Sequence, residues 1–137
     1  MTDNETKKEY LKQYENKCKK LRSIEEQRDT LIESKRSAKT QILSDMPKGS
    51  KQMDLSDYIV QCEVLLTEII KLRNECMSMM INIEARILAM PDGLQSSILH
   101  KRYIQFMTWE QICVDIGYCW KQTHRLHSRA LNNINMT

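Results

Sequence analysis

The sequence predicts an all-α protein in two domains, a long antiparallel helical hairpin over residues 1–90 and a helix-turn-helix over residues 91–137. Three observations predict this fold. Apolar residues recur at helical spacing through two long segments. The 137 residues include only three Gly and two Pro, and 28% are charged while 6% are aromatic, which is typical of long helices and coiled coils. Near the carboxyl end, a short amphipathic segment, a glycine and a basic segment follow one another closely.

The first helix of the hairpin is predicted from about Asn4 to Leu43. Its apolar positions are Leu11, Tyr14, Cys18, Leu21, Ile24, Leu31, Ile32, Ala38 and Ile42. Charged residues interrupt this seam at Glu25, Arg28, Lys35 and Lys39. The helix is therefore expected to pack without forming a continuous zipper. The lysines near the amino terminus, including Lys7 and Lys8, alternate with acids, and the pattern favours a solvated helix face over a nucleic-acid-binding arm.

The turn of the hairpin is predicted near residues 45–54. This segment contains the sequence Met46-Pro-Lys-Gly-Ser50. Proline cannot donate a backbone hydrogen bond, and glycine permits the chain to reverse. The two long helices are therefore expected to run antiparallel, as a coiled-coil arm.

The second helix is predicted from Leu55 to about Met90, with apolar residues every seven positions and a second set four places on. Leu65 and Leu72 widen this stripe beyond what one two-stranded seam uses, so we expect the arm to form a homo-dimer or higher oligomer. The expected oligomerisation residues are Leu55, Ile59, Cys62, Leu66, Ile69, Cys76, Met80, Ile83 and Ile87. A monomer folded back on its own domain buries the same stripe and remains the alternative.

Two helix starts are predicted after the arm. Asp92, between Pro91 and Gly93, is expected to cap a helix that runs to about Gln105 and packs through Leu94, Ile98 and Leu99. Thr108 and Gln111 have the spacing of a capping box, which predicts a helix from Trp109 with an apolar face at Ile112, Cys113 and Ile116. Gly117 is expected to end that helix, because glycine adopts a positive φ at little cost.

The last helix is predicted from about Trp120 to Asn133. Its expected inward positions are Thr123, Leu126, Ala130 and Ile134. The opposite face presents donors that suit base edges and phosphates in a major groove. The expected DNA-binding residues are Trp120, Lys121, Gln122, His124, Arg125, Ser128 and Arg129, with Lys101 and Arg102 from the preceding helix.

Two of these residues, Trp120 and Arg102, have an alternative. Trp120 either contacts a phosphate through its indole N–H or packs against the turn. Lys101 and Arg102 touch the phosphate backbone, or Arg102 instead pairs with an acid such as Glu110 or Asp115.

The segment from about Leu94 to Leu131 resembles the fourth, promoter-reading region of bacterial sigma factors. The resemblance rests on Ile98-Leu-His-Lys-Arg-Tyr103, Thr108-Trp-Glu-Gln-Ile112, Ile116-Gly-Tyr118 and His124-Arg-Leu-His-Ser-Arg-Ala-Leu131. With the arm, the whole chain resembles small phage and prophage transcriptional regulators of Gram-positive bacteria. The resemblance implies sequence-specific binding to promoter DNA and RNA polymerase as a further partner. Cys119 and Thr123 depart from the family pattern, which has a Ser or Thr cap and a branched apolar residue there.

The distribution of charge agrees with a DNA-binding carboxyl end. The formal net charge is only +3. Residues 94–137 contain five basic and two acidic residues, and the other 93 contain 16 of each, so all the positive excess lies in the proposed DNA-binding end. Neither a signal peptide nor a membrane-spanning run is expected, which predicts the cytoplasm of a bacterial host cell.

The cysteines and histidines do not predict a metal or catalytic site. Five cysteines at irregular spacing suit a reducing compartment. Cys113, Cys119, His124 and His127 have the wrong spacing for a common zinc site. We find no enzyme signature and expect no cofactor. The alternatives to a DNA-binding regulator are an adaptor or inhibitor acting through the coiled-coil arm, and a DNA-packaging component of a phage.

Overall fold

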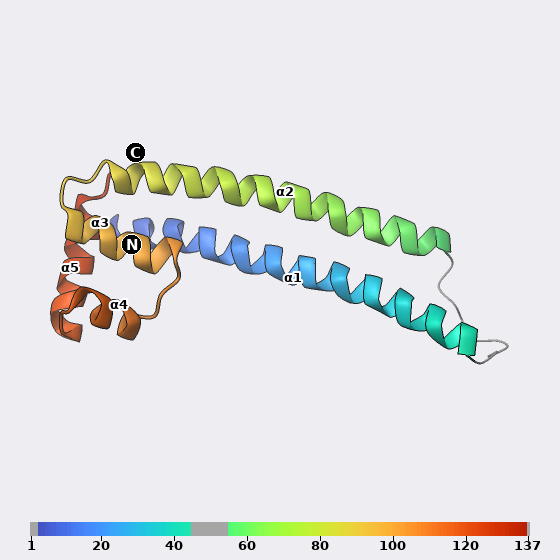
Figure 1. Cartoon of the computed structure of the whole chain (residues 1–137). Coiled ribbons are helices and arrows are strands. Elements are labelled where there is room, and N and C mark those ends of the chain that lie inside the picture. The colour runs from blue at the N-terminus through green and yellow to red at the C-terminus, as the bar shows by residue number, and fades with distance from the viewer. Residues whose placement is uncertain (1–2, 45–54, 137) are drawn as a thin grey trace. The chain divides into compact units, whose positions relative to one another are not determined.

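The computed structural model describes residues 3–44 and 55–136, apart from the side chains of residues 38–44. Within these ranges the chain is all-helical, which confirms the predicted fold class for the described residues (Figure 1). The helices are α1 (Asp3–Ser44), α2 (Leu55–Leu88), α3 (Gly93–Leu99), the π-helical η1 (His100–Ile104), α4 (Trp109–Ile116) and α5 (Trp120–Asn133). The predicted turn near residues 45–54 lies outside the described residues.

Contacts divide the chain into two compact parts, and the division does not follow the predicted boundary at residue 90. One part joins Met1–Cys18 to Glu75–Thr137, and the other is Lys19–Asn74. The beginning of α1 and the end of α2 therefore belong with the carboxy-terminal helices, whereas the sequence assigns them to the arm.

The Lys19–Asn74 part pairs α1 with α2 in antiparallel directions. Ile24 packs with Ile69 and Leu72, and Leu21 and Leu65 lie against this cluster. Two polar contacts join α1 to α2, one before and one after this cluster along α2. They are the Arg73 Nε to Glu25 Oε1 ion pair at 3.6 Å and Lys35 Nζ, 4.4 Å from the ring centroid of Tyr58. The small apolar cluster agrees with the predicted discontinuous seam.

In the other part, the beginning of α1 and the end of α2 also lie side by side. Lys17 Nζ is 2.9 Å from Glu75 Oε2, and Asn82 Nδ2 donates to the Tyr10 hydroxyl at 2.7 Å. The carboxy-terminal helices complete the core of this part. Its most buried large side chains are Leu11, Ile83, Ile98, Leu99, Tyr103, Thr123, Ile112 and Ile134.

The helix predicted after the arm begins where Asp92 caps it. The Asp92 carboxylate accepts the Gln95 backbone N–H at 2.9 Å, as expected of an N-cap residue. The helical stretch reaches Ile104, close to the predicted end at Gln105, but its last turn is π-helical. Gln105 N donates to His100 O at 3.0 Å, the five-residue spacing of that turn.

A short link with one unusual backbone conformation leads from η1 to α4. Phe106 has φ 58°, which is uncommon for a residue other than glycine. Its ring lies 5.7 Å from the ring of Tyr14 in α1, and Arg102 Nη1 donates to the carbonyl of Met107 at 3.0 Å. Aromatic packing and a cationic hydrogen bond thus hold the link in place. None of the described helices combines the length and the apolar character needed to cross a membrane.

Candidate nucleic-acid interface

Helix α4 begins with the predicted capping box. Gln111 N donates to Thr108 Oγ1 at 3.2 Å, and Thr108 N donates to Gln111 Oε1 at 3.0 Å. These two bonds satisfy backbone groups that a helix start otherwise leaves unpaired. The local sequence therefore determines where α4 starts, at Trp109 as predicted.

A tight turn then leads into α5. Gly117 adopts φ 77° and ψ 27°, the left-handed conformation predicted for it, and its N–H donates to Cys113 O. Helix α5 starts at Trp120 with Cys119 as N-cap residue, and the Cys119 side chain makes no capping bond. The absent Ser or Thr thus leaves the start of α5 without the side-chain bond that holds α4.

The inward face of α5 agrees with the prediction at three positions. Thr123, Ala130 and Ile134 are buried, whereas Leu126 is half-buried. The Thr123 hydroxyl accepts a hydrogen bond from the Cys113 thiol at 3.4 Å. This contact joins α5 to α4.

Sequence reasoning missed two buried positions of α5, His127 and Leu131. Positions 123, 127, 130 and 134 have helical spacing, so His127 lies on the inward face. The prediction placed its more apolar neighbour Leu126 on that face instead. The Nε2 of buried His127 is hydrogen-bonded to the Tyr103 hydroxyl at 2.8 Å. Burial, followed by the nearby positive charges, lowers the pKa of His127 to about 4. The imidazole is therefore a neutral core group that fixes α5 against η1.

The outward face of α5 carries five exposed polar side chains, all predicted DNA-binding residues. They are Lys121, Gln122, Arg125, Ser128 and Arg129. None of the five has a side-chain hydrogen bond or ion pair within the described ranges 3–44 and 55–136. Unpaired donors on one helix face are free to bind an external acceptor.

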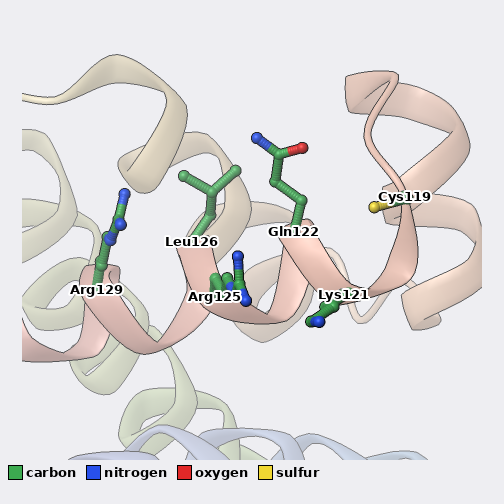
Figure 2. Close-up of a pocket in the computed structure, with 6 residues that line it drawn as sticks. All are labelled: Cys119, Lys121, Gln122, Arg125, Leu126 and Arg129. Atoms are coloured by element: carbon green, nitrogen blue, oxygen red, sulfur yellow. The ribbon is translucent and has the colours of Figure 1, made fainter.

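Two shallow hollows flank this face. One is lined by Cys119, Lys121, Gln122, Arg125, Leu126 and Arg129, and Figure 2 shows that these six residues come from the turn and from successive turns of α5. The other is lined by Trp120, Lys121, His124, Arg125, Ser128 and Arg129. Lys121, Arg125 and Arg129 border both, so a row of three cations separates the two hollows.

Aromatic rings cover one edge of the face. The His124 ring lies between two indoles, 4.5 Å from the Trp109 centroid and 4.4 Å from the Trp120 centroid. Its Nε2 is buried without a hydrogen-bond partner within the described part of the chain. Burial, then the charges of Lys8 and Arg102, lower the pKa of His124. Trp120 thus packs on His124 of its own helix while remaining 52% exposed, which leaves its phosphate contact open.

Lys101 and Arg102 are both engaged within the fold. Lys101 Nζ pairs with Asp115 Oδ2, joining η1 to the end of α4. Arg102 lies with its guanidinium carbon 4.8 Å from the Trp109 ring centroid and bonds to Met107 O, so it takes neither of the acids considered for it. In this conformation both cations position α4 instead of lying free for phosphate.

The expected oligomerisation residues do not share one environment. Ile69, Cys76, Ile83 and Ile87 are buried within the chain, and Ile69 packs with Ile24 of α1. Cys62 and Met80 are half-buried. Only Leu55, Ile59 and Leu66 are exposed.

The candidate zinc residues serve other contacts. Cys113 bonds to Thr123, and His127 bonds to Tyr103. Among the described residues, no three His, Cys, Asp or Glu side chains are grouped so as to hold a metal ion.

Comparison with known proteins identifies no matching protein family, no matching curated protein and no matching solved structure.

Proposed function

We propose that the chain binds double-stranded DNA through α5 and acts as a transcriptional regulator, without catalytic activity. The observation that carries the proposal is the outward face of α5, where Lys121, Arg125 and Arg129 form an unpaired cationic row beside Gln122 and Ser128. A helix fits the major groove, where Arg and Lys bind guanine edges and Gln binds adenine. The buried opposite face keeps these side chains directed outward.

The connection between α4 and α5 supports the same proposal. A capped short helix, a left-handed glycine and a second helix are the parts of a helix-turn-helix, in which the second helix reads the groove. The resemblance to the fourth region of sigma factors adds promoter DNA of phage or prophage genes as the target. It also adds RNA polymerase as a further proposed partner.

The test is retention of double-stranded fragments from the chain's own genomic neighbourhood, measured at two salt concentrations. We expect selective retention of one fragment, a steep loss of affinity with salt, and an affinity at least tenfold lower for Arg125→Ala. Arg22→Ala is the matched control, because Arg22 is also exposed and belongs to Lys19–Asn74, the part of the chain that does not contain α5. Equal effects of the two substitutions, or no retention of any fragment, would overturn the proposal.

A second proposal concerns self-association, for which the exposed face of α2 is the specific observation. Large apolar side chains on α2 remain exposed within each part, whereas the described side chains of α1 include no exposed large apolar residue. In Lys19–Asn74 they are Leu55, Ile59, Val60, Val64, Leu66 and Ile70, and in the other part Met77, Ile81 and Leu88. We propose that a second copy of the chain covers this face; an adaptor function through the arm is the competing explanation.

A further inference from the structure

The first turns of α1 are attached to the proposed DNA-binding helices. Lys7 Nζ donates to the Leu131 carbonyl of α5 at 2.9 Å, where a cation suits the carboxyl end of a helix. Leu11 is fully buried, and the buried Tyr14 packs on Phe106 ahead of α4. These contacts belong to one compact part of the chain, so α1 contributes to the same surface as α5.

Two lysines beside these anchoring residues remain exposed. Lys8 and Lys12 follow Lys7 and Leu11 in the sequence and are four residues apart, so they lie on one face of α1. Neither has a side-chain hydrogen bond or ion pair to another described residue. Lys7 and Lys17, by contrast, pair with Asp3 and Glu75.

Each lysine adjoins a residue that packs within this part of the chain, since Lys7 bonds to α5 and Leu11 is fully buried. The charges of Lys8 and Lys12 contribute to lowering the pKa of His127, and Lys8 has the same effect on His124, although burial is the larger cause for both rings. His124 lines the hollow that also contains Lys121 and Arg125. The charge of Lys8 thus acts on His124, whose ring meets Trp109 and Trp120 at one edge of the proposed reading face.

We propose that Lys8 and Lys12 of α1 bind backbone phosphates of the DNA duplex whose groove α5 enters. This inference rests on the proposed DNA-binding function. Phosphate contacts supply much of the affinity of a DNA-binding protein and fix its orientation, whereas base contacts supply sequence preference. The first turns of α1 thus act as part of the DNA-binding domain, in place of the solvated face that their alternating charges predict.

The test compares three full-length variants on the selected fragment over a range of salt concentrations. Lys8→Gln/Lys12→Gln is expected to reduce the slope of log affinity against log salt by about one per lysine, with an unchanged preference for the selected fragment over an unrelated one. Lys20→Gln/Lys71→Gln removes the same charge from exposed positions in Lys19–Asn74 and is expected to leave the slope unchanged. Lys8→Arg/Lys12→Arg keeps both charges and should retain the slope.

The outcomes distinguish the inference from the function on which it rests. If the wild-type protein binds and Arg125→Ala abolishes binding, but Lys8→Gln/Lys12→Gln has the slope of the Lys20→Gln/Lys71→Gln control, only the role of α1 is overturned. If the wild-type protein retains no DNA, both proposals fail. Circular dichroism of each variant establishes that it is folded, and a loss of slope in Lys8→Arg/Lys12→Arg would also contradict phosphate binding.

Discussion

Protonation of His127 is expected to destabilise the fold. Its Nε2 is hydrogen-bonded to the Tyr103 hydroxyl, and burial holds the pKa of His127 at about 4, below the ordinary 6.5. The unfolded chain therefore binds the proton more readily between these two values, so stability is complete above pH 6.5 and falls as the pH decreases towards 4. The difference between 6.5 and about 4 corresponds to roughly 3 kcal/mol in the free energy of unfolding.

Urea unfolding at pH 7.5, 6.5, 5.5 and 4.5 measures this loss, with His127→Phe as the comparison. The phenyl ring fills the site and cannot titrate. The variant therefore starts less stable, because the Tyr103 hydroxyl loses its hydrogen-bond partner, but its stability changes less with pH. The carboxylates titrate in both proteins, so their effect on stability cancels when the two pH profiles are subtracted. Parallel pH profiles for the two proteins would contradict a buried neutral imidazole.

The backbone at Gly117 gives a second prediction for a single residue. Its φ of 77° disfavours any side chain, although an added Cβ would meet nothing within 4 Å. Gly117→Ala should therefore cost about 1–2 kcal/mol through backbone strain alone. Gly93→Ala is the matched control, since Gly93 has equally open space and no positive φ, and it should be neutral or slightly stabilising. Thermal unfolding of both variants checks this, and equal melting temperatures would contradict it.

Helices α4 and α5 differ in how they begin, because α4 has a side-chain cap and α5 has none. Substitutions of their N-cap residues should therefore change the stability in opposite directions. Cys119→Ser should raise the stability by about 1 kcal/mol, because a serine oxygen accepts a backbone N–H that the thiol leaves unpaired. Thr108→Ala should lower it by about the same amount, since it removes the hydroxyl oxygen that accepts the Gln111 backbone N–H. Denaturant midpoints measure the two effects; a neutral Cys119→Ser would show that the start of α5 needs no cap.

Helix starts and ends were predictable from the sequence wherever local chemistry determines them. The capping box at Thr108, the glycine at Gly117 and the cap at Asp92 involve residues within one turn of each other, so the printed sequence contains the whole interaction. The buried partner of η1 was not predictable in this way. Whether Leu126 or His127 turns inward depends on the Tyr103 hydroxyl, 24 positions away from His127 in the sequence.

On the scale of the whole molecule, the long helices show why the spacing of apolar residues did not identify the surface that is open to a partner. The apolar stripe of α2 is wider than one seam needs, and periodicity does not reveal which of its residues α1 covers. The answer depends on the register of two helices whose contacts are distant in sequence, such as Glu25 with Arg73 and Lys17 with Glu75. The expected oligomerisation set therefore mixes residues buried within the chain with exposed ones such as Ile59.

Two adjacent residues separate folding from self-association. Ile69 is 3% exposed and packs with Ile24, whereas Ile70 is 50% exposed. Ile69→Asp should destabilise the arm by several kcal/mol, because it buries an unpaired carboxylate in a small core. Ile70→Asp should leave the melting temperature of the monomer nearly unchanged and weaken association, because it places a charge in the apolar face that a second copy is proposed to cover.

Sedimentation velocity over a range of concentrations, with circular dichroism melts of the same samples, measures both effects. A wild-type protein that sediments as a monomer at every concentration would overturn self-association, and a stable Ile69→Asp variant would contradict the packing of α1 on α2.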